Sequence, residues 1–477
     1  RSTRRSLLPA LACISALLVL GHGEEAAAAD TVRPDPVVLS GASLPKLTGI
    51  GAADLVAFRF RDPKHGKGRW KQVPVQLDER KLVDFGSAPP NNATPGSEGT
   101  VYGTAPIGQA VLQYADPQTF VGADPVAGLD GDDEVALIGS DAGEKASKHV
   151  ERPKHTRGSR TSIKLTDPLG GPKGFLYLFR SKGGLDPTAG RDYVRYQFEL
   201  TSGDYKATYR RADGPNPETS TVTTDAYTIG FSDRWYYDAL AIRAGGATNV
   251  DILDGFKFSF GPTSCARSEA TFNDAEGAFV ANLDGPVRAI RAYVGANSGP
   301  LTERTNIFYP DRHLIVTDLR VHPVPGPLTY HDLSAAGLGM TYSDSVNPAG
   351  VTVDGNPESL TDGVPSWRLW TGAQGSLVSA DRVEGSFAAE LLASGHDWYL
   401  DDSTPAPNLQ CWGDAQAYGQ AGIQSTYSMP NTDPRSTPTA TLHETTTDLL
   451  AGPGLGAAAA AGLAQGLDSP LQVSVGG

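Results

Sequence analysis

Short stretches in which apolar and polar residues alternate recur along this chain, and most of them end at Gly or Pro. Successive side chains of a strand point to opposite faces, so a period of two is typical of strands with one buried face. Few runs of 12 or more residues keep a helical period. The pattern predicts an all-β fold of antiparallel strands with few helices. The clearest predicted strands cover residues 55–60, 175–179, 193–198, 287–294 and 313–321.

The spacing of these stretches predicts two antiparallel β-sandwich units. The first covers residues 30–150, and a larger, supersandwich-like unit covers residues 174–450. Residues 151–173 are polar and basic, which predicts a linker or an exposed excursion. Residues 451–477 are rich in Gly and Ala, and they predict a loosely held helix or a disordered tail outside the functional part.

The first 29 residues have the three parts of a secretory signal peptide. A positive start is followed by an uncharged apolar run at 7–20 and by four alanines at 26–29. The run is shorter than the roughly 20 residues that a membrane-spanning helix needs. Arg4 and Arg5, with apolar residues one position later, resemble the twin-arginine export signal. We therefore expect a secreted bacterial protein that is free of the membrane once the signal is removed.

Charge and cysteine content agree with an extracytoplasmic protein. There are 54 Asp and Glu against 40 Lys and Arg, a net charge of −14. This balance argues against nucleic acid as a partner, because phosphate binding needs clustered cations. After signal removal only Cys265 and Cys411 remain, and in an oxidising compartment two cysteines most simply form a disulfide. The alternative is two free thiols, one of them catalytic.

The most distinctive passage lies in the first predicted unit. The sequence WKQVPVQLDER at 70–80 is followed by LDGDDEV at 129–135 and by SDAG at 140–143. Together they resemble the amino-terminal β domain of uncharacterised secreted bacterial proteins, in which a PVQ-x-DER strand precedes a D-x-DDE turn. The resemblance covers residues 68–143, and it implies a domain type without implying a reaction.

The acidic turn in this passage is also a candidate metal site. Asp130, Asp132 and Glu134 alternate like oxygen ligands of a hard cation, which predicts Ca²⁺ as a cofactor. Val135 occupies the position at which an EF-hand loop needs Gly, so the turn is not an EF-hand. The alternative is an ordinary turn whose carboxylates accept backbone N–H bonds. Residues 354–358 have the same acidic spacing.

Residues 288–344 carry many Arg, Tyr and His side chains on predicted strands and loops. Lyases that cleave uronic-acid polymers need a group that neutralises the substrate carboxylate and a Tyr or His that transfers the proton. The predicted site residues are His331 or His322 as acid/base, Tyr330 or Tyr293 as the proton-transfer partner, and Arg288, Arg291, Asn297, His396 and Trp398 for substrate binding. The alternative is an ordinary solvated sheet face.

Two other chemistries stay open for this region. A glycosidase would need two carboxylates about 5–10 Å apart, and Asp332, Asp344, Asp397 and Asp401 are the candidates. A metal site made of His alone is less favoured, because His313 and His322 are nine positions apart and would face opposite sides of one strand.

Tryptophans gather in the larger unit, where exposed rings could stack on sugars. Trp398 lies beside His396 and Asp397 and is the predicted sugar platform, while the alternative for each Trp is a place in the core. Trp367 and Trp370 are three positions apart, so on a strand they would face opposite sides.

The sequence Tyr330-His331-Asp332, the pair Gly339-Met340 and the W-x-L-W-x-G segment at 367–372 are similar to the large β-sandwiches of secreted polysaccharide lyases and aldose-mutarotase-like proteins. The likeness is one of architecture and residue types. It carries no catalytic role to any residue here.

Three hypotheses about function follow. The first is a secreted enzyme that acts on a polysaccharide or another extracellular glycan, as a lyase or a glycoside hydrolase. The second is a non-catalytic glycan-binding or cell-envelope protein that calcium stabilises. The third is a metalloenzyme exported by the twin-arginine route.

Overall fold

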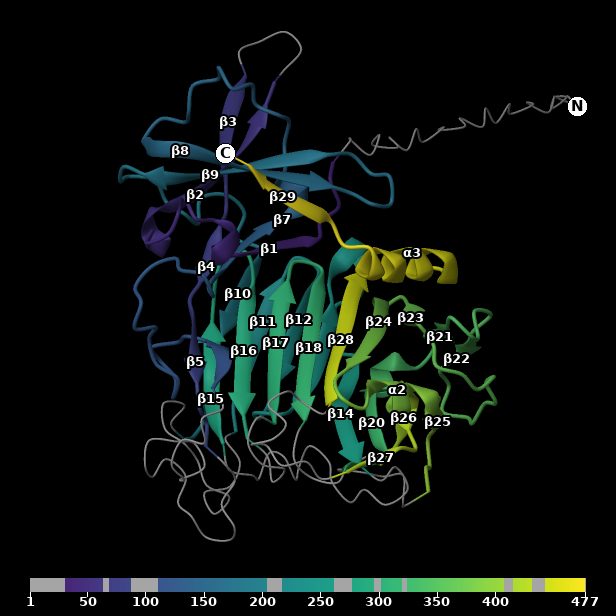
Figure 1. The fold of residues 1–477 in the computed structure, drawn as a ribbon. Coiled ribbons are helices and arrows are strands. Elements are labelled where there is room, and N and C mark those ends of the chain that lie inside the picture. The colour runs from purple at the N-terminus through teal and green to yellow at the C-terminus, as the bar shows by residue number, and fades with distance from the viewer. Residues whose placement is uncertain are drawn as a thin grey trace, which may run out of the picture.

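The computed structural model describes residues 31–62, 68–86, 110–203, 217–260, 277–295, 302–319, 324–406, 415–430 and 442–476 (Figure 1). Several predictions fall outside these ranges: the signal peptide at 1–29, Asn297, His322, Cys265 and Cys411. Within the described ranges the chain forms antiparallel sheets and two α-helices, which confirms the predicted all-β fold.

The first unit is a sandwich of a five-stranded and a three-stranded sheet. Apolar side chains that alternate along the strands, such as Leu137, Leu165 and Leu178, are buried between the two sheets. The five-stranded sheet has the order β29 (Gln472–Gly476), β8 (Thr156–Thr166), β9 (Gly174–Ser181), β2 (Leu55–Arg61) and β3 (Arg69–Val73). The three-stranded sheet has the order β1 (Pro36–Ser40), β7 (Glu134–Ile138) and β4 (Gln76–Asp78).

Two predicted boundaries need correction. Residues 151–173 contain strand β8, whose polar residues alternate with the buried Ile163 and Leu165, so this segment belongs to a sheet and is neither a linker nor an exposed excursion. The Gly/Ala-rich end is also ordered. Helix α3 (Ala457–Asp468) packs Ala460 and Ala464 on the second unit, and β29 then returns to the edge of the first (Figure 1). The small side chains that suggested a loose tail allow this close packing.

The second unit is a larger sandwich, with a nine-stranded sheet on one side. Its order is β15 (Ala278–Leu283), β16 (Ala289–Val294), β17 (Glu303–Tyr309), β18 (Arg312–Leu319), β28 (Leu442–Ala451), β24 (Gly375–Glu384), β23 (Arg368–Gly372), β21 (Thr341–Asp344) and β22 (Val351–Thr352). Every pair of neighbours is antiparallel.

Two four-stranded sheets cover the inner face of this large sheet. One has the order β10 (Val194–Gln197), β11 (Ser220–Thr224), β12 (Tyr227–Phe231) and β13 (Tyr237–Ile242). The other has the order β14 (Leu253–Phe260), β20 (Pro327–Leu333), β26 (Ala417–Ser425) and β25 (Gly395–Asp402). The remaining elements are β5 (Arg80–Val83), β6 (Val111–Tyr114), β19 (Val324–Pro325), β27 (Ser428–Met429), helix α2 (Ala388–Ala393) and five 3-10 turns at Gly41–Ser43, Ala52–Asp54, Gly139–Asp141, Ala244–Gly246 and Ala335–Gly337.

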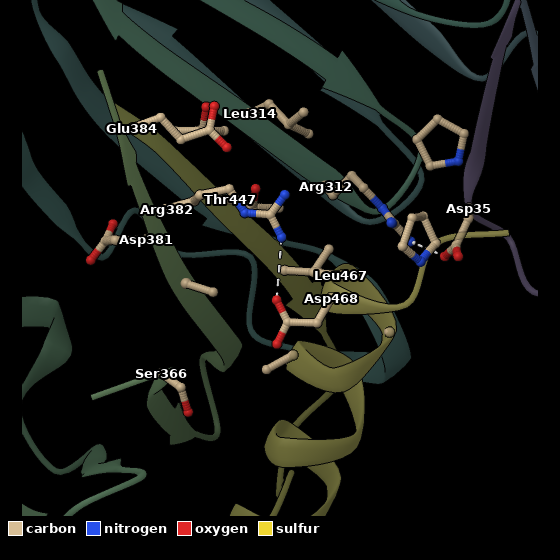
Figure 2. A pocket seen from close by; sticks show the side chains of 16 residues that line it. Asp35, Arg312, Leu314, Ser366, Asp381, Arg382, Glu384, Thr447, Leu467 and Asp468 are labelled. Carbon is tan, nitrogen blue, oxygen red and sulfur yellow. Dashed lines mark hydrogen bonds and ion pairs between the residues drawn. The ribbon is translucent and has the colours of Figure 1, made fainter. Parts of the chain in front are cut away.

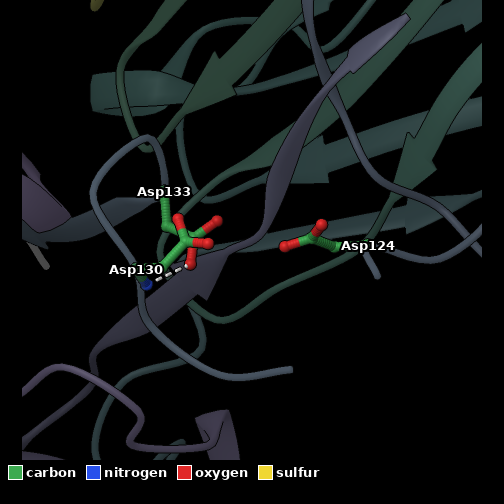
Figure 3. A group of neighbouring side chains, drawn as sticks. All are labelled: Asp124, Asp130 and Asp133. Carbon is green, nitrogen blue, oxygen red and sulfur yellow. Dashed lines mark hydrogen bonds between the residues drawn. The ribbon is translucent and has the colours of Figure 1, made fainter. Parts of the chain in front are cut away.

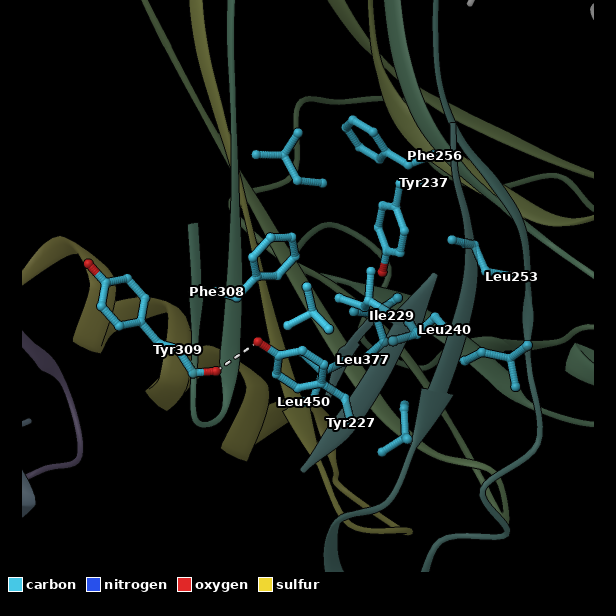
Figure 4. Close-up of a cluster of buried hydrophobic side chains, with 14 of the residues drawn as sticks. Tyr227, Ile229, Tyr237, Leu240, Leu253, Phe256, Phe308, Tyr309, Leu377 and Leu450 are labelled. Carbon is cyan, nitrogen blue, oxygen red and sulfur yellow. Dashed lines mark hydrogen bonds between the residues drawn. The ribbon is translucent and has the colours of Figure 1, made fainter. Parts of the chain in front are cut away.

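Aromatic and aliphatic side chains from both layers form the core of the second unit (Figure 4). Tyr227 from the smaller sheet donates its hydroxyl hydrogen to the carbonyl of Tyr309 on the larger one, at 2.7 Å. Trp370 lies in this core, whereas Trp367 packs on the outer face beneath α3. The prediction that these two rings face opposite sides is confirmed. None of the helices in the described ranges is long and apolar enough to cross a membrane.

Candidate functional site

Arg288 and Arg291 are both buried in internal ion pairs. Arg288 binds Asp78 at 2.7 Å and Glu134 at 2.6 Å, and these two carboxylates belong to the first unit. Arg291 binds both oxygens of Glu218, and neither its side chain nor that of Glu218 is accessible. A guanidinium with buried carboxylate partners is not available to a substrate. The structure therefore gives both arginines a structural role in place of the predicted substrate-binding role.

The predicted proton-transfer residues are separated in space. Tyr293 packs edge-on against Trp235, at 4.7 Å between ring centroids, within the hydrophobic core. His331 points into the sandwich, where its Nε2 lies 2.9 Å from Asp448 Oδ2. Tyr330 is the next residue on the same strand, so it faces the opposite side of the sheet. Because Tyr330 and His331 point to opposite faces of the sheet, they cannot both contact the same substrate as a proton-transfer pair.

The structure does bring Tyr330 and Trp398 onto one sheet face. Both are paired with Gly422 on the strand between them, so the two side chains flank the same position. His396 lies two residues before Trp398, on that face and half-exposed, and its Nδ1 is 3.0 Å from Asp362. Asp397 points inward to Arg368, and burial raises its pKa to about 7.

The other predicted carboxylates are engaged within the protein. Asp332 is buried and bound to Lys257 at 2.8 Å, and burial raises its pKa to about 6. Asp344 accepts the backbone N–H groups of the turn that follows it. Asp401 accepts the backbone N–H groups of three residues, Asp354, Gly355 and Gly419. These contacts leave no open pair of the kind that a glycosidase needs.

Two acidic groups among the described residues are close enough to hold a metal ion. One consists of Asp124, Asp130 and Asp133 (Figure 3). It differs from the predicted calcium set, because Glu134 is bound to Arg80 and Arg288, and Asp132 is not among the three. The Asp133 carboxylate already accepts two backbone N–H bonds, as the ordinary-turn alternative requires.

The second acidic group brings together two segments that are distant in the sequence. The first is 354–358, whose acidic spacing resembles that of the predicted calcium site, and the second contains Asp401, one of the predicted glycosidase carboxylates. Asp354, Glu358 and Asp401 offer oxygens within 4.8 Å of one another. Burial, with the charges of Asp401 and Asp354, raises the pKa of Glu358 to about 7. Burial and neighbouring negative charge disfavour the ionised form of a carboxyl group, so Glu358 gains or loses its proton close to neutral pH.

A groove of about 460 Å³ lies on the outer face of the nine-stranded sheet (Figure 2). Strands β18, β28 and β24 form its floor, and the end of α3 and the start of β1 form its walls. Successive side chains of a strand point to opposite faces, so alternate residues of these strands face the groove. The lining residues include Arg312 and Leu314 on β18, Thr445 and Thr447 on β28, and Arg382 and Glu384 on β24.

Most charges in the groove are compensated. Arg312 binds Asp35 at 3.0 Å, and Arg382 reaches Asp468 at the end of α3 at 3.3 Å (Figure 2). Glu384 has no ion pair within the described part of the chain. The groove therefore offers paired charges, threonine hydroxyls and one free carboxylate.

A polar row continues the groove beyond Thr445. His443 lies opposite Asp318 on one neighbouring strand and opposite Glu384 on the other. The His443 Nδ1 is 2.7 Å from Asp318 Oδ1, and this hydrogen bond raises the pKa of His443 above its usual value. The side chains of His443 and Asp318 are 37% and 28% exposed, so solvent and ligands reach them. We name these three residues the outer row.

Sequence reasoning missed the outer row. The alternation of His443, Thr445 and Thr447 within 442–451 is a strand signal that could have indicated one shared polar face. The partners Asp318 and Glu384 lie in distant segments, and no local pattern links them to His443.

Fold and groove together define an all-β double sandwich with a polar groove on its largest sheet. No protein-family model matches the chain, and no curated protein matches it in sequence. Solved structures similar to it include an alpha-mannosidase from Enterococcus faecalis V583, with a TM-score of 0.42, 8% identity, and coverage of 94% of this chain and 45% of that one. Another is a glycosyl hydrolase family 38 protein from Enterococcus faecalis, with a TM-score of 0.40, 8% identity, and coverage of 94% and 46%. This chain thus spans less than half the length of either.

Proposed function

We propose that this protein acts on carbohydrate outside the cytoplasm and binds a neutral glycan in the groove beneath α3. The observation that supports this most is the groove itself. Its volume of about 460 Å³ lies within the range of roughly 300–1,000 Å³ that is typical of small-ligand sites.

The chemistry of the groove favours a ligand rich in hydroxyl groups. Neither Thr445 nor Thr447 makes a side-chain hydrogen bond to any described residue, so both hydroxyls are available to a ligand. The ion pairs of Arg312 and Arg382 present donors and acceptors side by side. A hydroxyl group both donates and accepts hydrogen bonds, and it can therefore use such a surface fully.

The charge balance of the groove disfavours an anionic polymer. Four carboxylates line it, from Asp35, Asp381, Glu384 and Asp468, and all except that of Glu384 are paired with an arginine. A polyuronate would therefore meet the unpaired carboxylate of Glu384 and, among the described residues, no unpaired arginine that could neutralise its own charges. A neutral polysaccharide consequently fits this site better than the uronic-acid substrate of a lyase.

Binding measurements on glycan panels test this proposal. We expect retention on immobilised neutral polysaccharides and none on polyuronates of equal chain length. The double variant Thr445→Val, Thr447→Val keeps the shape of both side chains and removes the hydroxyls. It should bind at least about tenfold more weakly, since two hydrogen bonds contribute roughly 1 kcal/mol each.

A matched control is Thr228→Val, at a half-buried threonine on β12 away from the groove. It should bind like the parent protein. Equal affinity of the double variant and the control, or failure of the parent protein to bind any neutral glycan, would refute the assignment of the groove.

A further inference from the structure

The outer row has a regular geometry that follows from strand register. Asp318, His443 and Glu384 lie directly opposite one another on β18, β28 and β24. Adjacent strands are about 4.8 Å apart, so the backbones at Asp318 and Glu384 are separated by roughly 9.6 Å with His443 between them. An imidazole thus lies between two carboxylates, at the end of a groove that Glu384 also lines.

The contact with Asp318 orients the imidazole of His443. Because Nδ1 is hydrogen-bonded to Asp318, Nε2 is the nitrogen that can exchange a proton with a ligand. No described residue forms a hydrogen bond with Nε2. The raised pKa of His443 keeps a larger fraction of the imidazolium at neutral pH, which is the form that donates a proton.

Glu384 supplies the complementary group. It is exposed and has no ion pair with a described residue, so its carboxylate is free to accept a proton. Glu384 is the last residue of β24, and its pairing with His443 ends the β24–β28 ladder, so the antiparallel pairing that leads up to Val383 places the two backbones side by side. Proton transfer at a reacting bond needs this kind of positioning.

We infer that the outer row is a catalytic site that hydrolyses a glycosidic bond of the glycan held in the groove. This inference rests on the proposed function, since the groove must first bind the glycan. His443 donates its Nε2 proton to the glycosidic oxygen as the bond from that oxygen to the anomeric carbon breaks. A water molecule attacks the anomeric carbon and gives one proton to Glu384. That proton returns through solvent to His443, so one water is consumed and two shorter glycans are released.

A second surface His–Asp pair shows what distinguishes the outer row. His396 is bound to Asp362 at 3.0 Å, but its partner across β26 is Gln424, which cannot act as a base. Neither His396 nor Asp362 lines the groove, whereas Glu384 of the outer row lines it and His443 is paired with Glu384 on the neighbouring strand. Only the outer row combines an oriented His, an unpaired carboxylate and a groove among the described residues.

The test measures binding and turnover separately on the same variants. On a neutral polysaccharide that the parent protein binds, the release of new reducing ends should fall at least about a hundredfold in His443→Gln and in Glu384→Gln, as expected for loss of a general acid or base. Dissociation constants should change less than about threefold, and melting temperatures should stay close to that of the parent protein. His149→Gln, at an exposed His of the first unit, is the control and should keep full activity.

Asp318 is a positioning residue, and a pH profile tests it. Asp318→Asn removes the interaction that raises the pKa of His443, so the alkaline limb of the rate profile should move to lower pH. Binding of the glycan without release of reducing ends would overturn this inference and leave the proposed function standing. Absence of any glycan binding would overturn both. Full activity of His443→Gln would show that bond cleavage takes place elsewhere.

Discussion

Replacement of Arg291 by Met distinguishes a structural arginine from a substrate-binding one. The guanidinium donates to both oxygens of Glu218, to the Tyr196 hydroxyl at 3.1 Å and to the carbonyl of Arg234 at 3.2 Å. Its charged centre also lies 4.3 Å from the centre of the Phe231 ring. Met removes all of these contacts and leaves the Glu218 carboxylate buried without a cation.

The expected cost is about 3–5 kcal/mol of unfolding free energy, because breaking a buried pair on one side leaves an uncompensated charge. Urea denaturation followed by tryptophan fluorescence measures this cost. The double variant Arg291→Met, Glu218→Leu should be more stable than Arg291→Met alone, since it removes the orphaned carboxylate. Arg195→Met, at an arginine that is 78% exposed, is the matched control and should change stability by less than about 0.5 kcal/mol.

The opposite pattern would refute this account of Arg291. If Arg291→Met unfolds at the same urea concentration as the parent protein and loses glycan binding, then Arg291 contacts the ligand and the buried ion pair does not hold the two layers together.

Further predictions concern titration, packing, metal and export. Burial raises the pKa of Glu303 to about 8 from an ordinary 4.5, so the folded state holds a proton that the unfolded chain releases. As the pH rises from 4.5 to 8, the parent protein should therefore lose about 1–3 kcal/mol of unfolding free energy relative to Glu303→Gln. Denaturation curves at several pH values measure this difference, and a difference that does not change with pH would contradict the prediction. A Cβ at Gly422 would lie 1.8 Å from the carbonyl oxygen of Thr329, so Gly422→Ala should lower the melting temperature. A Cβ at Gly462 on α3 would meet no atom within 4 Å, so Gly462→Ala should raise the unfolding free energy by about 0.5–1 kcal/mol. If the acidic turn binds Ca²⁺, millimolar calcium should raise the melting temperature of the parent protein and leave that of Asp130→Asn unchanged, and equal shifts would exclude this site. Replacing Arg4 and Arg5 by Lys should stop export if the route is twin-arginine, and undiminished secretion would exclude that route.

Local patterns predicted the strands well. The stretches at 55–60 and 313–321 correspond to β2 and β18, because alternation along a strand depends only on the residues of that strand. The opposite orientations of Trp367 and Trp370 follow from the same rule. The division into units was less accurate. Strand β8 forms a hairpin with the following β9, but its other neighbour is β29 near the end of the chain, and no local pattern in 451–477 indicates that pairing.

The substrate-binding role that residue types predicted for two arginines was wrong. Arg288 and Arg291 have the side chains that a substrate carboxylate would need, but carboxylates of the protein itself, from Asp78, Glu134 and Glu218, bind them. Whether an arginine meets solvent or a buried partner depends on the layers packed against it. The sequence alone does not show which layer packs against a given strand.

The amino-acid sequence by itself determined the all-β class, the positions of most strands and the face of its strand on which each side chain lies, because these follow from the period of two in the backbone. The tertiary structure decided which strands became neighbours. His443 and Asp318 are 125 residues apart, and they meet only because β28 pairs with β18 in one register. That register is set because a shift by one residue would expose the inner face of the large sheet, which is buried against two smaller sheets. The free energy of this burial depends on residues from the whole chain. The groove and the outer row therefore exist only in the folded protein, where this register places their residues side by side.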